Sequence, residues 1–275
     1  MTETWRFLLS GPADGPTNMA VDEAIAEAVG HGQVPPTLRF YGWQPPCLSV
    51  GRFQAVAGAV DENECRVNGF DLVRRPTGGR AILHDTPARE LTYSLAIPQR
   101  DLRVAGDVPA SYQAISAALV RGLAQLGVTA QLAPARESPL HSATAACFDQ
   151  PSDYEVLADG RKLVGSAQAR SGGVLLQHGT VLLDVNLAAW VAVLRTPTGL
   201  TPATFQTHLA DRLTSLHQLL GRPVAFDEAA DALRAGFREA FRVALAPGAL
   251  TETERKRAEV LCRQKYAADS WTFRR

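Results

Sequence analysis

The sequence lacks the features that mark membrane, secreted and nucleic-acid-binding proteins. No apolar run approaches the length of a membrane span, and the N-terminus, MTETWRFLLSGPADG, has no basic segment followed by an apolar one. The formal net charge is zero, from 28 basic and 28 acidic residues, so the chain as a whole exerts no pull on nucleic acid or on a membrane surface. We therefore expect a cytoplasmic protein with neither kind of partner.

Cysteine is scarce as well. The four cysteines (Cys47, Cys65, Cys147 and Cys262) are widely spaced and form no CxxC pair, which argues against a disulfide framework or a zinc site. No two histidines have the spacing of metal ligands on a helix, and no cluster of carboxylates accompanies them. We expect no bound metal, and we expect Cys47, Cys65 and Cys262 to be inert.

Lysine is the rarest charged residue. Of the 28 basic residues only three are lysines, at positions 162, 256 and 265, and the rest are arginines. Arginine stays charged and planar, whereas lysine presents a compact charge whose pKa shifts readily on burial. Lys162 is either a residue with a chemical role or a chance exception in an arginine-rich chain, and composition does not separate the two.

The stretch around Lys162 predicts a β-hairpin. The dipeptide Asp159-Gly160 lies between runs of β-forming residues, a pattern typical of a two-residue turn. The two predicted strands are Tyr154–Ala158 and Arg161–Gln168, and this turn places Leu157 opposite Lys162. We therefore expect Lys162 on a strand, one step from a tight turn.

Three kinds of residue needed for acyl transfer lie near this hairpin. Cys147 precedes it in a proline-broken segment, so we expect a loop cysteine that could act as a nucleophile. Lys162 could supply the positive charge that favours its thiolate. Small residues follow at Gly165-Ser166-Ala167 and at His178-Gly179, where His178 could pair with Cys147 or simply end a strand.

A second glycine-rich segment, RRPTGGRAILHD at 74–85, joins two predicted strands. Gly78 and Gly79 allow a close approach of backbone to a ligand, and Arg75 and Arg80 flank them. The segment is either a wall of a site for an acyl chain or an anionic group, or a tight turn with solvated arginines. His84 follows in the same segment.

The remaining pattern predicts the fold class. A helix is expected over roughly Asn18–Val29, capped by Thr17, and a β-strand with alternating large apolar residues over Glu90–Ile97. From about 187 the chain is mainly helical, and Thr251 and Glu254 form a capping box. Repeats and long linkers are lacking, so we predict a single α+β domain over residues 1–275, a mixed sheet flanked by helices.

Both glycine-rich segments resemble the lipoate–protein ligase A and octanoyltransferase family, which shares its catalytic domain with biotin–protein ligases. The resemblance rests on RRPTGGRAILHD at 74–85, ELTYSL at 90–95, and GRKLVGSAQ and LQHGTVLLD within 160–184. It covers nearly the whole chain. The segment CFDQPSDYEV at 147–156 is most similar to the cysteine-dependent octanoyltransferases of that family.

The resemblance implies a fold, an activity and a site. It implies the biotin/lipoate–protein ligase catalytic-domain fold and an acyl thioester on Cys147, with Lys162 lowering the pKa of that thiol. It also implies an acyl pocket lined by Gly78, Gly79 and the residues Gly165-Ser166-Ala167. Arg75, Arg80, His84, His178 and Gly179 complete the expected substrate-binding set.

The implied reaction transfers an octanoyl group from octanoyl–acyl carrier protein to a lysine of a lipoyl domain, with the glycine cleavage H protein as the expected acceptor and no cofactor. Arginines at 74, 75, 80, 161 and 170 are expected to dock acidic protein substrates. Three alternatives stay open: an octanoyl amidotransferase between lipoyl domains, an ATP-dependent lipoate ligase in which Cys147 is incidental, and a non-catalytic acyl-binding module. Arg80 stands where the ligases tend to have a third glycine, which favours a transferase.

Overall fold

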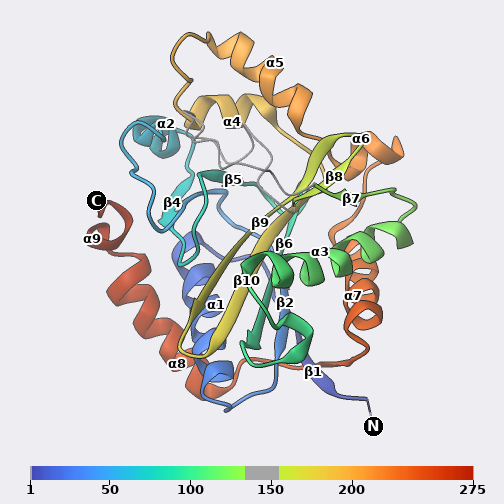
Figure 1. The fold of residues 1–275 in the computed structure, drawn as a ribbon. Coiled ribbons are helices and arrows are strands. Elements are labelled where there is room, and N and C mark those ends of the chain that lie inside the picture. Colours follow the sequence, from blue (N-terminus) through green and yellow to red (C-terminus); the bar gives the residue numbers. More distant parts are fainter. Residues whose placement is uncertain (1, 134–154, 275) are drawn as a thin grey trace.

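Two β-sheets and the helices around them make up the part of the chain that the computed structural model describes, residues 2–133 and 155–274 (Figure 1). The larger sheet contains β1 (Thr4–Leu9), β2 (Thr37–Tyr41), β6 (Glu90–Pro98), β7 (Gln131–Leu132), β8 (Val156–Ala158), β9 (Arg161–Ser171), β10 (Val174–Leu182) and β11 (Ala244–Pro247). Their order is β11-β1-β2-β6-β10-β9-β8-β7, with parallel pairs at the β11 edge and antiparallel pairs from β2 onward. The smaller sheet has the order β4-β3-β5, from β3 (Cys47–Val50), β4 (Asp71–Arg74) and β5 (Ile82–His84). The predicted mixed-sheet α+β fold is confirmed.

Helices cover both faces of the larger sheet. On one face lie α3 (Val108–Gln125) and α7 (Phe226–Phe241), and on the other α1 (Gly15–Gly30) and α8 (Glu252–Leu261). The smaller sheet packs with α2 (Glu62–Val67), α4 (Leu187–Val193) and α5 (Pro202–Arg212). The remaining turns are α6 (Leu216–Leu220), α9 (Asp269–Thr272), a 3-10 turn at Leu102–Val104 and a π-helical turn at Cys262–Tyr266.

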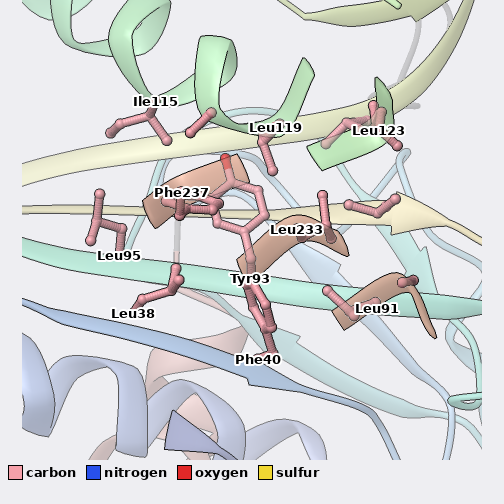
Figure 2. Packing of buried hydrophobic residues seen from close by; sticks show 14 of the residues in the cluster. Leu38, Phe40, Leu91, Tyr93, Leu95, Ile115, Leu119, Leu123, Leu233 and Phe237 are labelled. Atoms are coloured by element: carbon pink, nitrogen blue, oxygen red, sulfur yellow. The ribbon is translucent and has the colours of Figure 1, made fainter. Parts of the chain in front are cut away.

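In strand β6, apolar and polar residues alternate and point to opposite faces of the larger sheet. Leu91, Tyr93 and Leu95 belong to the core under α3 and α7, while Thr92 and Ser94 point to the opposite face. Figure 2 shows this core, in which Ile115, Leu119 and Leu123 of α3 and Leu233 and Phe237 of α7 pack over residues of β2 and β6. The face that carries the polar side chains is the one on which the site lies.

Several local expectations can be compared with the structure directly. The cap of α1 is Asp14, whose Oδ1 accepts from the backbone N–H of Thr17, so the expected Thr17 cap is wrong. The capping box of Thr251 and Glu254 is confirmed at the start of α8. Strand β11 was not predicted, because a four-residue edge strand with two exposed alanines carries no alternation.

No helix in the described ranges is both long and apolar enough to span a membrane.

Two glycines allow α3 and α7 to touch. A Cβ atom on Gly236 of α7 would lie 2.3 Å from the backbone nitrogen of Gly122 and 2.4 Å from the carbonyl oxygen of Ala118, both in α3. Backbone atoms cannot move aside as the end of a flexible side chain can. The packing of α7 on the sheet therefore depends on glycine at this crossing.

Gly236→Ala should lower the free energy of unfolding by about 2 kcal/mol, because overpacking against backbone exceeds the gain of about 1 kcal/mol in helix propensity. Urea unfolding of wild type and variant measures the difference. Gly11→Ala is the matched control, since no heavy atom lies within 4 Å of a Cβ at that position. A Gly236→Ala protein as stable as wild type would contradict the proposed close contact.

Candidate active site

A narrow pocket lies between the larger sheet, the smaller sheet and α1. About 370 Å³ of space lies between its walls, including the part that is open to solvent. The lining residues are Met19, Tyr41, Trp43, Ser49, Arg75, Ile82, His84, Thr92, Gly165, Ser166, Ala167, His178, Gly179 and Thr180. An apolar slot with a few fixed polar groups is the usual character of a small-ligand site.

The strand period decides which residues of β9 and β10 face this pocket. Ala167 and His178 line it, whereas Gln168 points to the other face and donates to Ser111 of α3. Ser166 reaches the pocket wall, but its hydroxyl lies 2.7 Å from the hydroxyl of Tyr93 in the α3 core. The predicted pocket residues Gly165, Ser166, Ala167, His178 and Gly179 thus lie together.

Asp22 of α1 anchors one wall. Its carboxylate is fully buried and forms a 2.8 Å ion pair with Arg39, and it also accepts from Tyr41 and Ser94 at 2.8 Å each. His178 Nδ1 lies 3.1 Å from its Oδ2 atom. Burial alone would raise the pKa of Asp22, but the hydrogen bond from His178 and the charge of Arg39 outweigh burial, and the pKa lies below its usual value.

His178 is held as a neutral ring. Burial lowers its pKa, and the opposing pull of Asp22 is too weak to compensate. A neutral ring that donates from Nδ1 to Asp22 must accept at Nε2, where the hydroxyl of Thr77 lies at 2.7 Å. His178 therefore ties the 76–80 loop to the sheet.

His84 has a similar environment on the opposite wall. Trp43 stacks on its ring with centroids 4.0 Å apart. Its Nε2 atom lies 2.9 Å from Ser49 Oγ, and its Nδ1 atom lies 3.1 Å from the buried carboxylate of Glu90. Because both ring nitrogens of each histidine have partners, the rings act as fixed walls of the pocket.

The glycine-rich 74–85 segment contributes Arg75 to the wall of the pocket, and not the two glycines that were expected there. Arg75 lines the pocket and wraps the loop around its guanidinium, donating to the carbonyl oxygens of Gly78 (2.7 Å) and Arg80 (2.8 Å). Gly79 has a φ of 88°, and a Cβ there would lie 2.6 Å from Arg75 Nη2. Gly78, Gly79 and Arg80 are not among the described residues that line the pocket.

Arg74 and Arg75 are buried, so the expectation that they dock protein substrates is wrong. Arg74 is 1% exposed, and it donates to carbonyl oxygens of Gly51 (2.8 Å), Gln54 (2.6 Å) and Thr272 (2.7 Å). A guanidinium group that donates hydrogen bonds to several backbone carbonyl oxygens holds together the loops that carry them. Here the guanidinium of Arg74 joins the loop after β3 to the C-terminal turn.

The predicted hairpin is confirmed in its turn and its register. Asp159 and Gly160 have φ values of 49° and 73°, as a two-residue hairpin turn requires, and Leu157 pairs with Lys162. Val156 pairs with Val164, so Leu163 is an extra residue that has no opposite partner in this ladder.

This bulge sets the direction of Lys162. Leu163 and Val164 both belong to the core under α3 and α7, as do Val156 and Ala158 across the hairpin. Leu157 and its partner Lys162 therefore face the other way, on the pocket side of the sheet. Lys162 is not among the described pocket-lining residues, but it lies three positions before Gly165 on the same strand.

Lys162 is 3% exposed and forms an ion pair with Oε1 of Glu155, whose side chain is 2% exposed. Glu155 was not among the predicted site residues. The signal was available, since Glu155 lies two residues before Leu157 and so on the same face, diagonal to Lys162 across the predicted hairpin.

Cys147, the predicted nucleophile, lies outside the described residues. Two of the other thiols are unsuited to nucleophilic attack, because burial raises the pKa of Cys47 well above its usual value and that of Cys65 to about 11. Cys262 is partly exposed on the far side of α1, 3.9 Å from Thr17.

Comparisons with known proteins agree with this geometry. The sequence model of the family described as lipoyl protein ligase A/B catalytic domain matches residues 14–238. Octanoyltransferase LipM of Symbiobacterium thermophilum is 46% identical over 280 residues, with all of both chains covered, and that of Bacillus subtilis is 36% identical with 99% of each covered. A putative lipoate protein ligase of T. acidophilum, solved with bound lipoic acid, is 27% identical with a TM-score of 0.79, covering 99% of this chain and 100% of that one. A lipoate-protein ligase A solved with ATP is also 27% identical, with a TM-score of 0.80 and 99% of each chain covered.

The pKa of His178 generates a pH prediction. Because the folded chain excludes a proton that the unfolded chain takes up below about pH 6.5, the stability contribution of neutral His178 is present above that pH and is lost as pH falls toward the folded-state pKa. His178→Gln should make the fall in unfolding free energy between pH 6.5 and pH 5 smaller than in wild type. Urea unfolding across that range tests this, with exposed His31→Gln as control. An unchanged pH slope in His178→Gln would rule out a buried neutral His178.

Proposed function

The chain belongs to the lipoyl protein ligase A/B catalytic-domain family, and from this premise we propose that it is an octanoyltransferase of lipoate biosynthesis. The observation that carries the proposal is the full-length similarity to octanoyltransferases LipM, at up to 46% identity with every part of both chains covered. We propose one catalytic domain over residues 1–275, acting in the cytoplasm without a cofactor.

The shape of the pocket supports an unbranched acyl chain as ligand. Apolar side chains such as Met19, Trp43 and Ile82 line the slot. A methylene chain gains from burying its surface in such a slot, at about 0.8 kcal/mol for each CH₂ group. The small residues Gly165 and Ala167 leave room for the chain along β9.

In the first step the thiolate of Cys147 attacks the carbonyl carbon of octanoyl–acyl carrier protein. A tetrahedral intermediate forms, the bond to the carrier sulfur breaks, and the carrier thiolate leaves and takes up a proton. Thioester exchange of this kind is almost isoenergetic, because one thioester replaces another. The donor is already activated, so the step needs no nucleotide.

In the second step a deprotonated lysine amine of a lipoyl domain attacks the thioester on Cys147. The attacking nitrogen loses a proton to water as the amide bond forms, the carbon–sulfur bond breaks, and Cys147 leaves as thiolate. The carbonyl oxygen gains charge in both intermediates. We assign Lys162 the role of stabilising that oxygen or the thiolate, since its ammonium lies on the pocket side of β9.

We assign the polar residues in the walls of the pocket a role in positioning the substrate. Arg75, His84 and His178 present fixed polar groups, and each owes its geometry to buried partners. The acceptor we propose is a lipoyl domain such as that of the glycine cleavage H protein. Transfer of octanoyl between two lipoyl domains would also pass through Cys147, but its first step would break an amide bond and release the donor lysine amine, and an ATP-dependent ligase would not need Cys147.

Ala167 should decide how long an acyl chain fits. Ala167→Leu fills part of the slot, so transfer of octanoyl should fall at least about tenfold while hexanoyl transfer falls less. Rates with hexanoyl and octanoyl carrier thioesters measure the effect. Ala169→Leu is the matched control, because Ala169 lies on the same strand outside this pocket, in a neighbouring hollow. Unchanged octanoyl transfer in Ala167→Leu would place the acyl chain elsewhere.

The donor test decides between transferase and ligase. Octanoyl–acyl carrier protein should octanoylate a lipoyl domain without nucleotide, and free octanoate with ATP and magnesium should give little product. Intact mass should show one octanoyl group on the enzyme, removable by hydroxylamine.

Cys147→Ser should abolish both the label and the transfer, while Cys262→Ser, the control, should keep them. If free octanoate with ATP is the better donor and Cys147→Ser keeps that activity, the protein is a ligase.

A further inference from the structure

The carboxylate of Glu155 is a buried titratable group that the two transfer steps do not use. Its side chain is 2% exposed, and that of Lys162 is 3% exposed. Nζ of Lys162 donates to Oε1 of Glu155 across the hairpin. A charged pair this far from solvent is uncommon, because desolvation costs each ion several kcal/mol before any attraction is counted.

The fold fixes this pair rather than leaving it to chance contact. Val156 and Ala158 of β8 face the core under α3 and α7, so Glu155 and Leu157 face the pocket side. The extra residue Leu163 turns Lys162 to the same side. Without that bulge, Lys162 would point into the apolar core.

We propose that Glu155 is a positioning residue for Lys162: its carboxylate keeps the buried ammonium protonated and fixes its direction on the pocket side of the sheet. This inference rests on the proposed function, in which Lys162 assists acyl transfer. It adds a residue to that role and specifies how Lys162 acts.

The pair implies a particular role for Lys162. A carboxylate beside the ammonium cancels most of its charge at a distance, so the pair exerts only a short-range field. Lys162 then acts as an oriented hydrogen-bond donor to the oxygen that gains charge, and less as a diffuse positive charge on the thiol. A donor that is already oriented needs no reorganisation when the intermediate forms.

The scarcity of lysine allows a direct test. Lysine labelled with ¹³C at Cε gives signals from only three residues, and Lys162→Ala identifies the one from Lys162. In Glu155→Gln, which keeps the shape but removes the charge, the titration midpoint of Lys162 should fall by at least about one pH unit, because the Glu155 carboxylate favours the charged form of the buried amine. Glu155→Asp keeps the charge and should leave the midpoint closer to that of wild type.

Glu252→Gln is the control. Its partner Lys256 forms an exposed pair, with the two side chains about 70% exposed, so the midpoint of Lys256 should stay unchanged. A midpoint of Lys162 that is equal in wild type and Glu155→Gln would overturn the inference. If Glu155→Gln does not fold, a midpoint in Glu155→Asp displaced further than one pH unit would overturn it as well.

Activity supplies the second measurement. The alkaline limb of the octanoyl-transfer profile should move to lower pH in Glu155→Gln, and Lys162→Ala with Glu155→Gln should be no slower than Lys162→Ala alone. An additive loss in the double variant would count against positioning through Lys162. Should wild type transfer no octanoyl group from any carrier thioester, the proposed function fails, and the titration of Lys162 still decides the inference.

Discussion

The buried carboxylate of Asp22 is the constraint on which the pocket depends. It receives hydrogen bonds from groups on β2, β6 and β10, and so joins α1 to three neighbouring strands at one point. Removing one partner of such a group leaves an unpaired buried charge or dipole, which costs about 3–5 kcal/mol for an ion pair. Arg39 and His178 are therefore held in place by the same atom, and Thr77 is held through His178.

The second constraint is the two-residue period of the strands and its interruption at Leu163. Along β6 the period sends large apolar groups to the α3 side and polar groups to the pocket side, and along β10 it sends His178 and Thr180 to the pocket. Along β9 the same period would send Lys162 into the core. The extra residue Leu163 reverses the direction just where the strand leaves the pocket, which is a common use of a bulge beside a functional site.

Sequence patterns predict those features of the fold that are determined by residues close together in the chain. The Asp159-Gly160 turn fixed the register that puts Leu157 opposite Lys162, and the Thr251 capping box needed only four residues to be recognised. The alternation in β6 predicted which side chains enter the core. By contrast, the burial of Arg74 depends on a C-terminal turn nearly 200 residues away, and no local pattern reports it.

The site was predicted only in part for the same physical reason. Gly78 and Gly79 were expected to line the pocket because glycine permits a close approach, but the group that approaches is the guanidinium of Arg75 from the same loop. A pair of glycines indicates that another group lies close to the backbone, but it does not identify that group. Asp22, Arg75 and Glu90 each have their own buried hydrogen-bond partners around the pocket, so a bound acyl chain meets polar groups that are already paired. These buried hydrogen bonds and ion pairs hold the shape of the pocket, and each buried charge in them has a desolvation cost.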